Sequence, residues 1–355
     1  SGGTFLMYSS GNKKFLQTYN VKGDVTVDAG ATLSANGSTA NDKINKLLIE
    51  GDMTVDGSFS AVSNNNKFDT EFVGSNDAYI SGTASGSDFK FFTLTCNKSA
   101  LDKKLILLTH NISSSDENSL LTMTRGTFEV AISDVKSVDL TKNVDLTIPG
   151  SACLSIVSGT ANVSNFDREK QLKLSGHISI SGGTLKVGRN ESNHNSILYA
   201  ADGLPSITIT GGRLVVNGQI SRETNQTTGS LVWNQTGGDV EVRGKDRNNS
   251  PEFAARGAFE ILNEGEFHMS GGTITVKNGF GGDTYGDIYL CPKVGDCSGG
   301  TIIADCPNAS LKLKTNIYLH DVEVKNLSAL VAYNDVNFNK LTINNTGVYS
   351  AQGNQ

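Results

Sequence analysis

Four aspartates near the N-terminus have the residue type and the spacing of a metal site. Asp24 and Asp28 flank Val-Thr-Val, and Asp52 and Asp56 flank Met-Thr-Val 28 residues later. If the two segments stack, Asp24 meets Asp52 and Asp28 meets Asp56. Carboxylate oxygens are ligands that Ca²⁺ prefers, so calcium is one hypothesis. Aspartate also favours turns, so a solvated row of turn residues is the simpler interpretation, and on it we expect no cofactor.

Residues that could perform catalysis are scattered along the chain. The five histidines form no H-E-x-x-H motif or other close ligand pair, and no serine lies in a G-x-S-x-G turn. Glycosidases need two carboxylates about 5–9 Å apart, and no pair is marked for that role. We therefore predict no catalytic, cofactor-binding or metal residue, and a protein that is not an enzyme. The histidines are His110, His177, His194, His268 and His320.

The five cysteines are an odd number, which excludes a fully paired intrachain framework. Cys291 and Cys297 bracket a five-residue loop that a disulfide could close, and they are our candidate pair. Buried free thiols are the alternative. Metal binding that adds Cys306 is a third hypothesis, but the spacings of six and nine residues miss the usual C-x₂₋₄-C pattern.

One loop concentrates positive charge in a chain whose net charge is −6. Its basic residues are Arg243, Lys245, Arg247 and Arg256. An acidic glycan is the partner that such a loop would fit, and a solvated loop is the plainer interpretation. The overall acidity disfavours non-specific nucleic-acid binding, and we predict none.

The fold that positions all of these residues is indicated by a sequence repeat. A small residue, a Gly-Gly pair and an apolar-x-apolar segment recur five times, with the second glycines 29, 26, 34 and 28 residues apart. A period of this size predicts a stacked solenoid, and the alternation predicts a strand after each pair. Glycine reaches positive φ without steric cost, so we expect the pairs to form coil corners. These turn glycines are Gly182, Gly183, Gly211, Gly212, Gly237, Gly238, Gly271, Gly272, Gly299 and Gly300.

Stacking the copies places equivalent residues in columns. One inward column would contain Leu185, Leu214, Val240, Ile274 and Ile302, and a second Val187, Val216, Val242, Val276 and Ala304. Parallel crossovers favour the right hand. We therefore predict an all-β fold, a right-handed parallel β-helix (β-solenoid) of about 12–13 irregular coils, with residues 1–355 forming a single solenoid.

Insertions lengthen some coils. We expect loops at Ser63–Ser75, Ser113–Asn118, Gly188–Pro205, Ser221–Gly229, Arg243–Gly257 and Lys277–Asp287. Insertions in solenoids often project from one face, which is often the binding face. Residues 1–7 already spell the repeat phrase, so we expect a piece of a longer repeat protein. No run of about 18 apolar residues occurs, and we predict no membrane insertion.

Several segments resemble the giant surface proteins of Bacteroidetes. The similar segments are Phe72-Val73-Gly74, Ile80-Ser81-Gly82-Thr83, Phe92-Thr93-Leu94-Thr95, residues 338–348, GDVTVDAGATL and GDMTVDGSFSA. Those proteins are adhesins and gliding-motility proteins exported through the type IX secretion system. The resemblance implies an extracellular location at the outer-membrane surface. It implies surface glycans, other cell-surface proteins and export or anchoring machinery as partners, and it carries over no catalytic residue.

The sequence as a whole favours a non-catalytic structural and adhesive stalk. The alternatives are a polysaccharide-active β-helix enzyme, either a lyase or a glycosidase, and a carbohydrate-binding module. A binding module would expose aromatic rings along one face for stacking on sugars. The aromatic residues near the basic loop are Trp233, Phe253, Phe259, Tyr285 and Tyr289.

Overall fold

The computed structural model describes residues 3–8, 17–36, 44–63, 66–114, 119–165, 170–189, 195–200, 203–223, 230–244, 257–278, 287–307, 310–327 and 329–344. All regular elements in these ranges are β-strands, stacked as a parallel β-solenoid of about 10 turns. The turns are fewer than the 12–13 predicted from the period, because long connections take up residues between strands. None of the described residues forms a helix with the length and apolarity to span a membrane.

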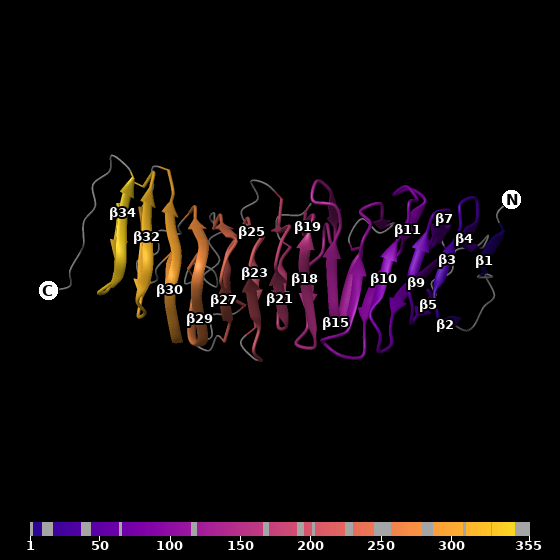
Figure 1. Ribbon diagram of the computed structural model, residues 1–355, viewed down its shortest axis with the longest axis horizontal. Helices are drawn as coiled ribbons and strands as arrows, with labels where there is room; N and C mark the ends of the chain where they lie inside the picture. The colour runs from indigo at the N-terminus through magenta and orange to yellow at the C-terminus, as the bar shows by residue number, and fades with distance from the viewer. Residues whose placement is uncertain are drawn as a thin grey trace. The chain divides into compact units, whose positions relative to one another are not determined.

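The chain divides into two compact units. Figure 1 labels many of the strands listed below. Unit 1 comprises Ser1–Val144 with Ser151–Ala161, and unit 2 comprises Asp145–Gly150 with Asn162–Gln355. Because the contacts divide the chain into two units, a single solenoid over residues 1–355 remains a prediction.

Unit 1 contains strands β1 (Thr4–Tyr8), β2 (Thr18–Val21), β3 (Val25–Val27), β4 (Thr32–Asn36), β5 (Asn45–Ile49), β6 (Met53–Val55), β7 (Ser58–Ser60), β8 (Val62–Ser63), β9 (Asn66–Phe72), β10 (Ala78–Ser81), β11 (Phe89–Phe91), β12 (Leu94–Asn97), β13 (Lys104–Leu107), β14 (Ser113–Ser114), β15 (Leu121–Ala131), β16 (Ser137–Asp139) and β18 (Ala152–Ser158). Strand β19 (Thr160–Val163) crosses the boundary between the units.

Unit 2 contains strands β17 (Leu146–Ile148), β20 (Leu172–Leu174), β21 (His177–Ile180), β22 (Thr184–Val187), β23 (Ile197–Tyr199), β24 (Ser206–Ile209), β25 (Arg213–Val216), β26 (Ile220–Arg222), β27 (Val232–Gln235), β28 (Asp239–Val242), β29 (Phe259–Val276), β30 (Ile288–Asp305), β31 (Ser310–Thr315), β32 (Leu319–Lys325), β33 (Ala329–Ala332) and β34 (Phe338–Asn344).

Three rows of parallel strands build unit 1. One row runs β1-β4-β7-β11-β14. The second runs β2-β5-β9-β12-β15, and the third runs β3-β6-β10-β13-β15. Between the rows, Phe59 packs against Phe68, Phe89 and Phe91 with ring centroids 5.7, 5.8 and 5.2 Å away. All four rings are fully buried, so aromatic packing fills the interior of unit 1.

The expected loop at Ser63–Ser75 is wrong, because β9 occupies most of it. This strand pairs in parallel with β5 and β12 and buries alternate residues. Phe68, Thr70 and Phe72 point inward and are fully buried, whereas the residues between them are polar. The Asn-rich start of the segment obscured a period-2 strand pattern.

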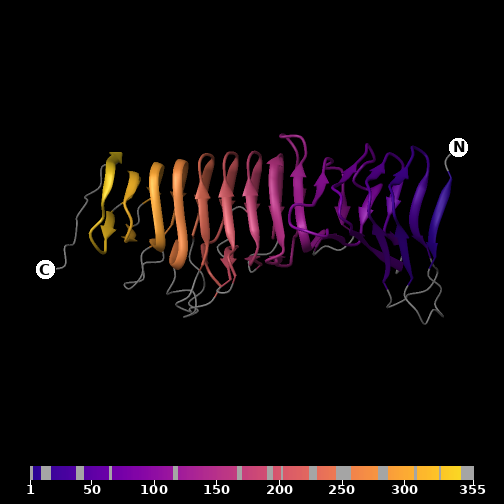
Figure 2. The same ribbon diagram turned by 60° about the horizontal axis from the view of Figure 1, so that its bottom comes forward.

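Unit 2 confirms the predicted columns. Leu185, Leu214, Val240, Ile274 and Ile302 are register partners along β22, β25, β28, β29 and β30, and none is more than 2% exposed. The column of Val187, Val216, Val242, Val276 and Ala304 forms in the same way. Figure 2 shows these strands as successive parallel arrows. Local alternation was therefore sufficient to assign the inward face.

Three predicted insertions, Gly188–Pro205, Arg243–Gly257 and Lys277–Asp287, begin at one corner of unit 2, and residues 190–194, 245–256 and 279–286 lie outside the described residues. Their described ends follow Val187, Val242 and Val276, which are partners in the same register column. The predicted bounds need correction in two places. Gly188–Pro205 contains β23, and Ser221–Gly229 begins inside β26. These short strands were missed because three residues are too few to show a period.

Candidate functional site

The glycine pairs precede β22, β25 and β28 as predicted, but in the last two copies they lie inside the long strands β29 and β30, where the register shifts. The second glycine of each pair has positive φ, between 58° and 84°. These residues are Gly183, Gly212, Gly238, Gly272 and Gly300. An L-residue with a Cβ rarely adopts this conformation, so these five positions favour glycine.

The first glycine of each pair has a steric role. A Cβ on Gly211 would lie 2.6 Å from the Ser181 carbonyl oxygen in the coil before it. A Cβ on Gly299 would lie 2.4 Å from the equivalent oxygen of Ser270. The backbones of successive corners therefore approach more closely than any side chain allows. The glycine pairs are structural residues rather than a phosphate cradle, because strands follow them.

Three of the four N-terminal aspartates, Asp24, Asp52 and Asp56, accept hydrogen bonds from the next coil through their carboxylates. Asp24 Oδ1 accepts the N–H of Asp52 at 2.8 Å, and Asp52 Oδ1 accepts the N–H of Tyr79 at 2.9 Å. Asp56 Oδ1 accepts both the N–H and the hydroxyl of Thr83. The hydroxyl bond, followed by the N–H bond, holds the pKa of Asp56 below its usual value.

We call this arrangement an aspartate cap, in which a carboxylate accepts a backbone N–H from the next coil. The same arrangement recurs along the described chain: Asp77 accepts from Lys104, Asp134 from Gly159, Asp145 from Gln171 and Asp287 from Lys312. Within the described ranges, no three His, Cys, Asp or Glu side chains gather as a possible metal site. The aspartates have a bonding role that needs no calcium.

The cysteines are thiols in this structure. Cys291 and Cys297 are both free, so the candidate disulfide is not formed. Cys291 is half-exposed on β30, whereas Cys297 is buried and its Sγ accepts the N–H of His320. Burial raises the pKa of Cys96 to about 12 and that of Cys153 to about 11. Such thiols are poor nucleophiles and poor metal ligands at neutral pH.

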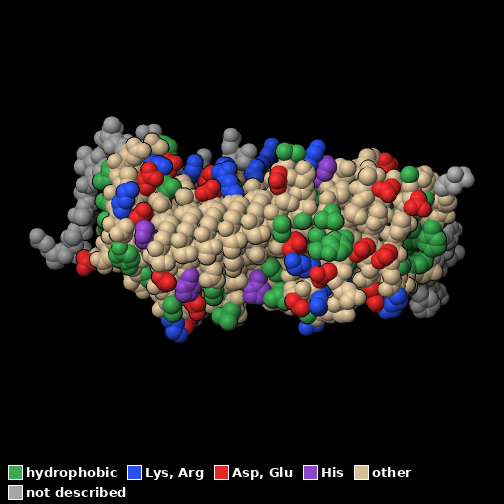
Figure 3. Space-filling model, in the orientation of Figure 1, with side chains coloured by type: hydrophobic (Ala, Val, Ile, Leu, Met, Phe, Trp, Pro, Cys, Tyr) green, Lys and Arg blue, Asp and Glu red, His purple; other side chains and the backbone are tan. Residues whose placement is uncertain are grey.

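Only Arg243 of the predicted basic loop belongs to the described residues. Lys245, Arg247 and Arg256 lie outside them. Arg243 Nε donates to Glu241 Oε1 at 2.6 Å, and Arg213 Nη2 donates to Oε2 of the same carboxylate at 2.6 Å. Acidic and basic side chains are interspersed on the face shown in Figure 3. Among the described residues, Arg243 takes part in a mixed-charge cluster with Glu241 and Arg213.

Of the aromatic residues near this loop, the three that the structure describes form no exposed sugar-stacking face. Trp233 and Phe259 are fully buried and pack edge to face with centroids 5.1 Å apart. Tyr289 is half-buried, and the Lys314 ammonium lies 4.9 Å from its ring centroid. Phe253 and Tyr285 lie outside the described residues.

A buried ion pair was not recognisable in the sequence. The backbone N–H and Nε of Arg222 both donate to Glu260 Oε1 at 2.9 Å. Glu260 Oε2 accepts the N–H of Gly257 at 3.0 Å, and the Glu260 side chain is fully buried. Arg222 and Glu260 are 38 positions apart in the sequence, and no motif joins them. The pair holds the start of β29 in place. Both carboxylate oxygens of Glu260 accept hydrogen bonds from Arg222 or Gly257.

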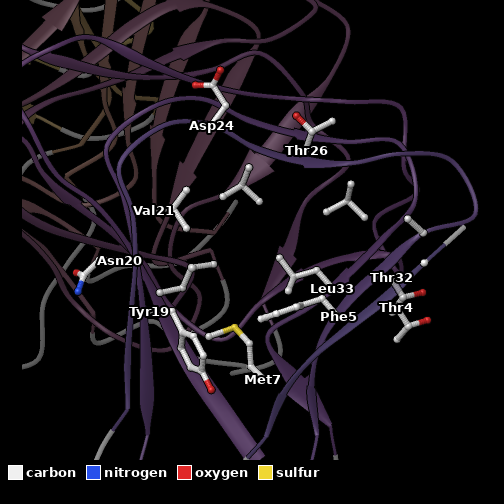
Figure 4. Close-up of a pocket in the computed structure, with 15 residues that line it drawn as sticks. Thr4, Phe5, Met7, Tyr19, Asn20, Val21, Asp24, Thr26, Thr32 and Leu33 are labelled. Atoms are coloured by element: carbon white, nitrogen blue, oxygen red, sulfur yellow. The ribbon is translucent and has the colours of Figure 1, made fainter.

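An apolar hollow of about 610 Å³ lies at the first turn of unit 1 (Figure 4). Tyr19, Met7, Phe5 and Leu33 gather on one side of it, and Asp24 lies on another. Strands β1, β2 and β3 pair there with β4, β5 and β6 and with no other strand of the described chain. Asp24 is the one charged residue in the lining, and its carboxylate already accepts the N–H of Asp52 in an aspartate cap. We assign no ligand to this hollow.

A second, polar cleft of about 170 Å³ lies elsewhere in unit 1. We call it the serine pocket. Its lining comprises His110, Ile112, Ser113, Ser114, Ser119, Leu120, Ser137, Val138, Asp139 and Lys142. Nucleophilic catalysis requires a hydrogen bond from the nucleophile to a base. Within the described chain, no hydrogen bond joins His110 to a serine hydroxyl, and the hydroxyls of Ser113 and Ser119 donate to backbone carbonyls.

The sequence analysis missed the serine pocket. Its residues come from two successive coils, and only stacking brings them together. No family model, curated protein or solved structure matches the chain.

Proposed function

We propose that the chain is a non-catalytic structural and adhesive segment of a secreted or surface-anchored bacterial protein. The observation that carries the proposal is the use of its carboxylates. Aspartate caps and the Arg222–Glu260 pair bind acidic groups into contacts between coils. A glycosidase needs two carboxylates that face a substrate instead.

The pKa values of the acidic side chains also support a structural role. Among the described carboxylates, the two with a shifted pKa, Asp56 and Glu241, are shifted downward. A general acid of a glycosidase needs a raised pKa. The strand ends Val187, Val242 and Val276 share one register column, and this supports the adhesive part of the proposal, because connections that begin at one corner suit the presentation of binding residues.

The finer proposal is a stalk of an adhesin or gliding-motility protein exported by the type IX system. It rests on the sequence resemblance given above. On this proposal the segment works outside the cell, associated with the outer membrane, and its partners are surface glycans, other surface proteins or anchoring machinery. Its role would be to extend and present binding loops.

A glycan array with the purified 355-residue chain tests the proposal. Each glycan that binds is then incubated with the chain and analysed for cleavage products, with and without calcium. Binding without products, unchanged by calcium, is the expected result, with heat-unfolded chain as the control. Released products would overturn the non-catalytic assignment in favour of a polysaccharide-active enzyme. A blank array would overturn adhesion to glycans and leave a structural spacer or a protein partner.

A further inference from the structure

The serine pocket is built by two successive coils of unit 1. Residues 110–114 come from one coil and residues 137–142 from the next, with residues 119–120 between them. Its volume of about 170 Å³ is that of about five to six water molecules in the liquid. One six-membered sugar ring with its hydroxyls occupies a comparable volume. The pocket is too small for the drug-sized ligands that fill cavities of about 300 Å³ or more.

The serine hydroxyls determine which hydrogen bonds a ligand must supply. Ser113 donates its hydroxyl proton to the Gly86 carbonyl, and Ser119 donates to the Leu121 carbonyl at 3.0 Å. Their oxygens retain lone pairs, so toward the pocket they are acceptors. A ligand must therefore bring its own donors. Lys142 and the exposed Ser137 supply donors in return.

The other side of the lining is apolar. Ile112, Leu120 and Val138 reach the pocket and are otherwise buried, with 9%, 3% and 4% exposed. A pyranose ring has the matching character, since hydroxyls project from its edge and C–H groups cover its face. Among the described lining residues, the formal charges of Lys142 and Asp139 cancel, which favours an uncharged sugar over a uronic acid.

We propose that the serine pocket binds a single neutral pyranose residue, presented at the end of a glycan. This deepens the adhesive part of the proposed function and rests on it. Lys142 and Ser137 donate to ring hydroxyls, Ser113 and Ser119 accept from them, and the aliphatic side chains cover the C–H face.

Ligand-observed NMR titration of the intact chain with methyl glycosides tests this. The probes are methyl glucoside, galactoside, mannoside and N-acetylglucosaminide, with methyl glucuronide as the charged comparison. One neutral glycoside should bind with a Kd near 1 mM, about what a single sugar ring with few contacts provides. Lys142→Met and Ser137→Val should each weaken it at least fivefold. Lys136→Met, an exposed neighbour outside the pocket, should not change it.

The outcomes separate this proposal from the one it rests on. Binding that survives Lys142→Met and Ser137→Val, or no saturation by any neutral glycoside, would overturn the serine pocket and leave the structural role intact. Cleavage of the matching nitrophenyl glycoside would overturn the non-catalytic role and leave the pocket standing. Circular dichroism of each variant confirms that a lost signal reflects the pocket and not unfolding.

Discussion

Glycine is required at the coil corners of unit 2 for two separate reasons. Gly212 has φ of +69°, and a Cβ there would lie 2.4 Å from the Gly182 carbonyl oxygen. Gly212→Ala should therefore lose about 1–2 kcal/mol of stability from the left-handed conformation alone, and more from the clash. Gly211→Ala should also destabilise, by the clash with Ser181. Urea unfolding of the two variants measures both effects.

The matched control for the corner glycines is Gly150→Ala. A Cβ on Gly150 meets only the Ser175 carbonyl oxygen, at an ordinary 3.6 Å. This variant should keep the unfolding midpoint within the error of the wild type. Equal stability of Gly212→Ala and Gly150→Ala would contradict a steric and conformational role for the pairs.

The side chains of Arg222 and Glu260 are only 8% and 0% exposed, so water cannot replace a lost partner. Arg222→Met leaves the Glu260 charge buried, and should cost about 3–5 kcal/mol of unfolding free energy. Lys293→Met is the control, because its ion pair with Glu264 is 63% and 62% exposed, and it should leave stability unchanged. The double variant Arg222→Met/Glu260→Gln should recover part of the loss. A strictly additive result would refute direct coupling.

Strands β25, β28 and β29 are joined across their outer surface by Glu241. Its carboxylate accepts from Arg213 and Arg243, and Lys277 Nζ lies 4.0 Å away. Burial by itself would raise the pKa of Glu241, but the Arg243 bond and the nearby positive charges outweigh it and lower the pKa. The folded state therefore binds this proton less readily than the unfolded chain does.

Because the pKa of Glu241 is lowered in the folded state, its contacts with Arg213, Arg243 and Lys277 are sensitive to acid. The stabilisation is complete above the unfolded glutamate pKa of about 4.3, and is lost as pH falls through the lower folded value. The wild type should therefore lose more thermal stability than Glu241→Gln between pH 6 and pH 2. Melting curves across that range check this, and parallel pH profiles would refute it.

Prediction from sequence succeeded for elements whose pattern is local and long enough to read. The columns through Leu185 and Val187 follow from alternation after each Gly-Gly pair. Strand β9 was missed because its inward Phe68 and Phe72 stand among polar residues, and β23 because it has only three residues. The serine pocket and the Arg222–Glu260 pair depend on which residues stacking brings together, and loop lengths shift that register.

At the scale of the whole chain, contacts fall into two units, and each has its own thiols. Cys96 and Cys153 belong to unit 1, and Cys297 and Cys306 belong to unit 2. Stacked coils depend mainly on their neighbours, so we expect the units to unfold at different urea concentrations. Pulsed thiol alkylation with peptide mass spectrometry should give two midpoints. Coincident midpoints for all four thiols would indicate a single cooperative unit.

The native chain provides the baseline for that experiment. Burial raises the pKa of Cys96 to about 12. At pH 8 its thiolate fraction is roughly a thousandfold below that of a free cysteine with a pKa of about 8.5. Alkylation of Cys96 should therefore be far slower than that of half-exposed Cys291. Rapid labelling of Cys96 without urea would show that unit 1 opens locally.

The aspartate caps all have the same polarity along the chain. In each cap described here, the carboxylate belongs to the earlier coil and the N–H belongs to the later one, as in Asp24 with Asp52 and Asp287 with Lys312. A coil that carries such an aspartate therefore presents an anionic acceptor toward the segment that follows it, and the next coil supplies the backbone N–H donor. The two ends of a capped stack are thus chemically different, since one end offers carboxylate acceptors and the other offers N–H donors.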